Sequence, residues 1–193
     1  METAPNLRSD AYAGTAKAYL RFRPPYPARL LEALLGGVDL PRGAILLDLA
    51  CGPGRIALAL AHRFDRVWAV DLEPEMIAVG RTEGERLGIA NVAWSIGAAG
   101  QADIPNASVD LITIGEAFRC AGFAEVQDRS FSEPWAWSFE TIVGYLRSTS
   151  VCSDQALGGD AARLETELRC ALGGDGPFYD ELRSGYTVAR KGD

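Results

Sequence analysis

Between residues 44 and 114 the chain alternates between two apolar patterns, and this alternation limits the fold more than any other feature. Four apolar runs are typical of strands: residues 44–50, 66–71, 92–96 and 109–114. Two helical patterns separate the first three: residues 55–64 and 74–88. Strands that alternate with helices form a parallel sheet with helices on its faces. The sequence therefore predicts an α/β fold with a doubly wound, Rossmann-like sheet.

This pattern breaks after the fourth strand. The next strand-like segment, 124–131, follows with only Gly115 to Gly122 between them. Parallel neighbours need a crossover of about a dozen or more residues, usually a helix. We therefore infer that a helix and the strand after it are missing, and we expect a sheet that is shortened by about one strand.

A shortened sheet would leave one edge of the fourth strand unpaired, which is a risk for aggregation. Three arrangements would cover that edge. The last strands, 124–131 and 184–191, could pair with it in antiparallel fashion; EAFRCAG could form a helical turn that redirects the chain; or a second copy could cover the edge in a homodimer. We expect the first, with the homodimer as an addition.

Helices are expected on both sides of this region. The first is capped by Ser9 or Asp10, runs to about Leu20, and is broken by RPPYP at residues 23–27. A second helix, ARLLEALL, ends at Gly36-Gly37. Two further helices, 138–148 and 160–172, precede the last strand.

The composition excludes several classes of partner. The formal net charge is −7, which speaks against nucleic acid and anionic membranes. No run of 18 or more apolar residues offers a membrane span, and the N-terminus shows no secretion signal. Four scattered cysteines and a single histidine, His62, predict no metal site, and we expect a cytoplasmic protein.

The segment DLACGPGRIA, residues 48–57, has the pattern of a ligand-binding loop between a strand and a helix. Gly52 and Gly54 allow a sharp turn and leave the backbone open to a ligand. Asp71 lies about 20 residues further on, at the end of the second strand, where a carboxylate can accept both hydroxyls of a ribose. These features predict a nucleoside site at the carboxyl edge of the sheet.

Two nucleoside ligands fit the glycine pattern. Gly52, Gly54 and Ala57 satisfy the dinucleotide pattern, so a nicotinamide cofactor is open. Asp48 counts against it, because a carboxylate beside the glycines would repel a pyrophosphate and would suit a ligand that carries a sulfonium and an ammonium group. A helical segment of about forty residues before the first strand is also unlike many dinucleotide domains.

DLACGPGR followed by VWAVDLEPEMI resembles the first motif and the second-strand acid of the class I S-adenosylmethionine-dependent methyltransferases. The likeness extends to YLRFRPPYP, NASVDLITIGEAF and ETIVGYLRSTS, and so covers most of residues 10–192. The sequence is most similar to the type 11, small-molecule branch. The resemblance implies a single domain, residues 1–193, with a helical lid at 10–37, a cofactor-binding half at 44–114 and a shortened C-terminal half at 123–193 with a helical insertion.

The resemblance also implies a role for each matching residue. Asp48, Ala50, Gly52 and Gly54 would line the methionine end of S-adenosylmethionine, and Asp71 would hold the ribose. The adenine would contact Leu72, Met76 and the backbone at Gly100, Gln101 and Ala102. Ile114, Gly115 and Glu116 would face the sulfonium, while Tyr19, Arg23 and Tyr26 would close the site.

These roles define the expected function, which is methyl transfer from S-adenosylmethionine to a small-molecule acceptor. Glu116 is the titratable residue that we name as a candidate base. The alternative is a catalytically impaired relative that binds S-adenosylmethionine, or a partner, without turnover, and the lost segment favours it. For Trp135 and Trp137 we expect packing rather than contact with a substrate.

Overall fold

The computed structural model describes residues 12–98, 104–105, 108–115, 123–149 and 151–191. Its centre is a parallel sheet of four strands in the order β3-β2-β1-β4. The strands are β1 (Ile45–Leu49), β2 (Arg66–Asp71), β3 (Val92–Ile96) and β4 (Leu111–Ile114). The strand order reverses between β1 and β4, so a ligand crevice is expected at their carboxyl ends. The predicted α/β fold with a shortened sheet is confirmed.

The helices between the strands pack on the sheet and form the core. They are α3 (Arg55–Leu60), which continues as a short 3-10 turn (Ala61–Arg63), and α4 (Pro74–Arg86). The core joins fully buried Leu46 and Val67 of the sheet to Ala57, Leu60 and Ile77 of these helices. Leu35 of α2 (Ala28–Gly36) also belongs to it. The predicted second helix is therefore part of the core as well as of the lid.

Trp94 of β3 determines how closely α4 approaches the glycine loop. A Cβ atom placed on Gly54 would lie 2.3 Å from the Trp94 ring, and one on Gly80 would lie 2.6 Å from it. Neither position could carry a larger residue without displacing the ring. Gly54 is thus required by protein packing in addition to any contact with a ligand.

The first helix begins later than expected. Residues 12–15 form a turn, in which the Thr15 hydroxyl donates to the Tyr12 carbonyl oxygen at 2.7 Å, and α1 (Ala16–Phe22) follows. Ser9 and Asp10, the predicted caps, lie outside the described residues. The helix packs against α5 (Phe139–Arg147), where the Phe22 ring lies over Gly144. The first helix is therefore joined to the C-terminal half.

The prediction that the last strands pair with β4 is wrong. β5 (Phe123–Trp137) and β6 (Phe178–Lys191) pair with one another, antiparallel, in a separate two-stranded sheet, which we call the ribbon. Both strands are longer than the sequence suggested, and β5 includes Trp135 and Trp137. Each strand pairs along one edge with the other, and β4 gains no partner from this two-stranded ribbon.

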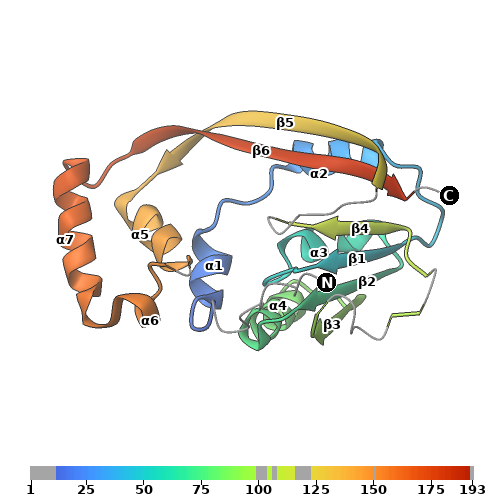
Figure 1. Cartoon of the computed structure of the whole chain (residues 1–193), viewed down its shortest axis with the longest axis horizontal. Helices are drawn as coiled ribbons and strands as arrows, with labels where there is room; N and C mark the ends of the chain where they lie inside the picture. Colours follow the sequence, from blue (N-terminus) through green and yellow to red (C-terminus); the bar gives the residue numbers. More distant parts are fainter. Residues whose placement is uncertain (1–11, 99–103, 106–107, 116–122, 150, 192–193) are drawn as a thin grey trace, which may run out of the picture.

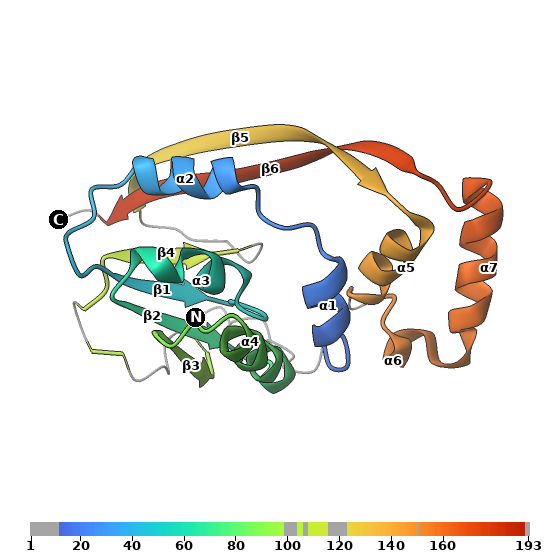
Figure 2. The same cartoon turned by 180° about the vertical axis from the view of Figure 1, so that it is seen from behind.

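The ribbon lies over α2, as Figures 1 and 2 both show. Arg29 of α2 donates to the Ser132 carbonyl oxygen, lies 3.6 Å from the Glu133 carboxylate and stacks on the Phe131 ring. Beyond α2 the ribbon extends to the predicted helical insertion, which consists of α5, the short α6 (Asp154–Leu157) and α7 (Ala161–Leu172). The molecule is therefore elongated, with the sheet at one end and α7 at the other.

The outer edge of β4 has no partner strand among the described residues. Among the described strands β4 pairs only with β1, and the Ile112 side chain is 52% exposed. The segment EAFRCAG, residues 116–122, lies outside the described residues. The homodimer that would cover this edge stays a prediction.

The α1–α5 contact gives a testable prediction about stability. In Gly144→Ala the new methyl group would lie 2.2 Å from the Phe22 ring, so one helix must move and we expect a loss of about 1–3 kcal/mol. For a chain of this size each kcal/mol lowers Tm by about 2–4 °C. Gly36→Ala is the control, because Gly36 is also helical and has no atom within 4 Å of the added Cβ. Equal Tm values for the two variants would contradict the packing argument.

Candidate cofactor site

The glycine loop leaves β1 in a sequence of left-handed turns. Ala50 has φ 51°, Gly52 54° and Gly54 76°. Ala50 is the single non-glycine residue with positive φ among those described, a conformation that costs an L residue about 1 kcal/mol or more. The Gly54 N–H donates to the Cys51 carbonyl oxygen at 2.9 Å and closes the turn. This closed turn holds Ala50 in its strained conformation.

Asp71 holds the loop against the end of β2. Its Oδ2 accepts the Gly52 N–H at 2.8 Å, and its Oδ1 accepts the Glu73 N–H at 2.8 Å. A carboxylate has about four acceptor sites, so two are left for hydroxyl groups of a ligand. The predicted neighbours Gly52 and Asp71 are therefore in direct contact.

Asp48 lies beneath the loop and is 1% exposed. Its Oδ1 accepts the Thr113 hydroxyl of β4 at 2.8 Å, and its Oδ2 accepts the Ala57 N–H of α3 at 3.0 Å. Burial raises the pKa of Asp48 from 3.8 to about 7; the two hydrogen bonds oppose this rise, and the charge of Asp71 adds to it. A cation bound nearby would favour the ionised form.

A small hollow opens at the carboxyl ends of β1 and β4. Its lining includes five residues that the sequence predicted: Tyr19, Tyr26, Asp48, Ala50 and Gly115. It also includes three that the sequence reasoning missed: Cys51, Arg55 and Ile56. These three residues lie in or directly after the glycine loop, and that position in the sequence could have identified them as lining residues. Burial, with the charges of Asp48 and Asp71, raises the pKa of the Cys51 thiol and disfavours its thiolate form.

The backbone beside Gly52 is open, whereas Gly115 is covered by a tyrosine. A Cβ on Gly52 would meet only Tyr19, at 4.0 Å, so the backbone there is open on that side. At Gly115 a Cβ would lie 2.6 Å from the Tyr26 hydroxyl. A ligand that contacts Gly115 therefore requires Tyr26 to move, as expected of a lid residue.

The remaining predicted residues occupy different surroundings. Leu72 is half-buried after β2, Met76 is buried in the first turn of α4, and Ile114 ends β4. The Arg23 guanidinium contacts Tyr145 and Ser148 of the C-terminal half. Gly100, Gln101, Ala102 and Glu116 lie outside the described residues. The roles given to all these residues stay predictions.

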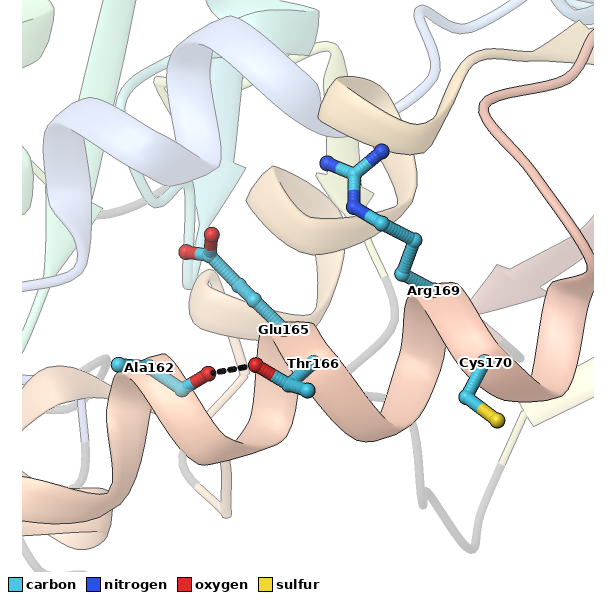
Figure 3. Close-up of a pocket in the computed structure, with 5 residues that line it drawn as sticks. All are labelled: Ala162, Glu165, Thr166, Arg169 and Cys170. Carbon is cyan, nitrogen blue, oxygen red and sulfur yellow. Dashed lines mark hydrogen bonds between the residues drawn. The ribbon is translucent and has the colours of Figure 1, made fainter.

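A second hollow lies on α7, at the far end of the molecule (Figure 3). Glu165 pairs with Arg147 of α5, and the Arg169 guanidinium stacks on the Phe139 ring at 4.0 Å. Figure 3 shows these two side chains directed toward α5, with Cys170 pointing away. Both charged groups thus attach α7 to α5, and the hollow offers no convergent polar groups for a ligand.

Four further expectations concern features away from the loop. His62 is exposed in the turn after α3. Trp137 packs edge-on against Trp135 and Tyr145, with ring centroids 6.0 and 5.4 Å away. Within the described part of the chain, no cluster of metal-binding side chains is found, and no helix has the length and apolar character of a membrane span.

Comparison with known proteins agrees with this site. Residues 46–133 match the family described as methyltransferase domain. The chain is 40% identical over 79 residues to a ubiquinone/menaquinone biosynthesis C-methyltransferase of Rubrivivax gelatinosus, covering 41% of this chain and 30% of that protein. A provisionally named methyltransferase of Dictyostelium discoideum is 29% identical over 141 residues, 70% of this chain and 51% of that protein. Other relatives are named RNA methyltransferases or trans-aconitate 2-methyltransferases.

The fold agrees with the same assignment. A provisionally named type II methyltransferase of Anaeromyxobacter dehalogenans superposes with a TM-score of 0.58 at 20% identity, covering 87% of this chain and 98% of that one. This neighbour shows the fold. The match of residues 46–133 to the methyltransferase domain, together with the methyltransferase relatives, supports a class I S-adenosylmethionine-dependent methyltransferase with S-adenosylmethionine as its cofactor. The chain spans about half or less of the length of the two curated relatives described above.

The raised pKa of Asp48 predicts a pH-dependent effect of Asp48→Asn on stability. Between pH 4 and 7 an unfolded chain ionises this carboxyl, whereas the folded chain keeps it protonated, so stability falls as pH rises through this window. The amide of Asn cannot ionise and still bonds Ala57 and Thr113. Its advantage in free energy of unfolding should grow by up to about 1.4 kcal/mol per pH unit and level off above pH 7.

Urea unfolding of both proteins between pH 5 and pH 8 measures this difference. A difference that stays constant over that range would contradict the raised pKa.

Proposed function

We propose that the chain binds S-adenosylmethionine at the carboxyl ends of β1, β2 and β4 and transfers its methyl group to a small molecule. The proposal rests on three groups that lie together at one edge of the sheet. The backbone at Gly52 is open, the Asp71 carboxylate accepts the Gly52 N–H at 2.8 Å, and Asp48 is buried beneath them. This set offers ribose acceptors and negative charge, as a nucleoside with a cationic end requires.

Each group has a separate part in binding. The unused acceptor sites of Asp71 take the ribose hydroxyls, and Leu72 and Met76 pack around the base, with the backbone at Gly100, Gln101 and Ala102 at its edge. Asp48, Ala50, Gly52 and Gly54 surround the methionine end. Tyr19, Arg23 and Tyr26 close the site, and Ile114 and Gly115 lie where the methyl group would point.

When bound, the cofactor supplies an electrophilic methyl group on a positively charged sulfur. The chain contributes position, because an acceptor atom held in line at about 3–3.5 Å gains most of its rate from orientation. The acceptor forms the new bond to the methyl carbon and the sulfur keeps the electron pair of the broken bond. Glu116 is proposed to take a proton from acceptors that must lose one.

Two observations support a small-molecule acceptor. The net charge of −7 gives little attraction to polyanions, and relatives named for quinone biosynthesis and trans-aconitate modify small molecules by their names. Other relatives are named RNA methyltransferases, so RNA is the alternative acceptor that an activity assay should include. The unpaired cysteines Cys51, Cys152 and Cys170 support the proposed cytoplasmic location.

A second candidate is a protein that binds S-adenosylmethionine without turnover. The specific observation in its favour is the direct passage from β4 toward β5, which is too short for the crossover helix and fifth strand. The nicotinamide alternative gains nothing from the structure, because Asp48 is buried directly beneath the loop that would have to bind a pyrophosphate.

The binding site predicts that Asp71→Ala abolishes affinity for S-adenosylhomocysteine. Two charge-assisted hydrogen bonds of about 1.5–3 kcal/mol each would be lost, which raises Kd by at least about a hundredfold. Calorimetric titration measures both proteins. Asp110→Ala is the matched control, because Asp110 also accepts a backbone N–H, from Ile45 at 2.8 Å, at the opposite end of β1.

A wild-type protein that is folded and binds neither S-adenosylmethionine nor S-adenosylhomocysteine would refute the proposed function. Binding without release of S-adenosylhomocysteine, when small molecules and RNA are offered as acceptors, would favour the second candidate.

The charge of Asp48 predicts a pH-dependent preference for S-adenosylmethionine over S-adenosylhomocysteine. The two ligands share their other charges, so the ratio of their Kd values isolates the sulfonium. Because Asp48 ionises near pH 7, the preference should rise from pH 6 to pH 8 by several-fold, up to about tenfold per pH unit. Titrations at both pH values check this, and Asp48→Asn should flatten the ratio. A pH-independent ratio in the wild type would count against contact with Asp48.

A further inference from the structure

The Arg23 guanidinium is clamped between two helices that are remote in sequence. Its Cζ lies 4.8 Å from the ring centroid of Tyr19 in α1 and 4.7 Å from that of Tyr145 in α5. Its Nε donates to the Ser148 hydroxyl at 3.0 Å, and its Nη1 donates to the Tyr145 hydroxyl at 3.4 Å. Ser148 is fully buried. A partly buried cation between two rings is held more firmly than a fully exposed ion pair.

The backbone of Arg23 is attached to the glycine loop. Its carbonyl oxygen accepts Nη1 of Arg55 at 2.6 Å, and Arg55 follows Gly54 as the first residue of α3. Tyr19, on one face of the guanidinium, is also the side chain nearest to the open side of Gly52. Arg23 thus joins α5 on one side to the loop and its lid tyrosine on the other. We call this set of contacts the arginine bridge.

Tyr145 is fixed from the far side as well. Trp137 of β5 meets its ring edge-on at 5.4 Å, and Trp135 continues the row at 6.0 Å. The ribbon therefore holds the ring on which Arg23 stacks. A displacement of α5 would carry the guanidinium, and with it the Tyr19 ring, away from the loop.

We propose that Arg23 is a positioning residue through which α5 controls the closure of Tyr19 over the cofactor site. The inference rests on the proposed function, and it adds a regulatory role for Tyr145 and Ser148, which lie on the C-terminal half. Arg23 need not touch the cofactor. Because coupling between two sites is reciprocal, a bound cofactor stabilises α5 as much as α5 strengthens binding.

A second contact between the same helices provides a matched control. Arg21 of α1 donates to the Glu140 carboxylate of α5 at 2.8 Å, with the two side chains 70% and 69% exposed. An exposed ion pair contributes little, and this one does not reach the glycine loop. Its removal tests whether any weakened contact between α1 and α5 has the same effect.

The test is the affinity for S-adenosylhomocysteine of three variants, measured by calorimetry. Tyr145→Leu removes the ring and should raise Kd by about tenfold, within the usual range of coupling between sites. Tyr145→Phe keeps the ring, and Glu140→Gln breaks only the exposed pair, so both should remain within about twofold of the wild type. Ser148→Ala is the second bridge variant, should Tyr145→Leu fail to fold.

Amide hydrogen exchange of the wild type tests the same coupling without a substitution. S-adenosylhomocysteine should slow exchange in α5 (Phe139–Arg147) and leave α7 (Ala161–Leu172) unchanged. Unchanged Kd in the folded bridge variants, unchanged exchange in α5, or an equal loss in Glu140→Gln would each overturn the inference while the proposed function stands. A folded wild type that does not bind the ligand would overturn both.

Discussion

The buried carboxylate of Asp48 joins the three elements on which the cofactor edge depends. It lies in β1, accepts the Thr113 hydroxyl from β4 and accepts the first-turn N–H of Ala57 from α3. Without these two bonds its burial would be strongly unfavourable. The same bonds fix β4 beside β1 at the reversal of strand order and fix the start of α3 under the glycine loop. The site geometry thus depends on how one buried carboxyl group is hydrogen-bonded.

The C-terminal half of the chain folds apart from the parallel sheet. β4 stays at the edge of the sheet, and the C-terminal strands form their own ribbon over α2 instead of extending the sheet. A two-stranded ribbon is marginal alone, and here Arg29 ties it to α2 through Phe131, Ser132 and Glu133. The cofactor half therefore does not need the ribbon for its own sheet, and the ribbon and α5 can serve as a lid support.

What the sequence could predict was set by local pattern. The strands and the contact between Gly52 and Asp71 follow from apolar runs and from the spacing of a short motif, so both were available before the structure. The pairing of β5 with β6 was not, because an alternating strand does not specify its partner. Arg23 was predicted as a lid residue, but its partners Tyr145 and Ser148 lie more than a hundred residues away. The contact between Gly54 and Trp94 could not be predicted either, because packing between distant elements does not show in the spacing of residues.

The charges of the site also bear on product release in the proposed reaction. Asp48 and Asp71 would place two carboxylates around a ligand whose sulfur is positive before transfer and neutral after it. Their attraction for the sulfur end would be lost once the methyl group has moved, so the product would be held less strongly than the substrate. A buried acid that ionises near pH 7 would strengthen this difference only while it carries its charge. The unfavourable burial of Asp48 in the unliganded chain thus has a functional use, because the bound cation is the partner that makes its ionised form favourable.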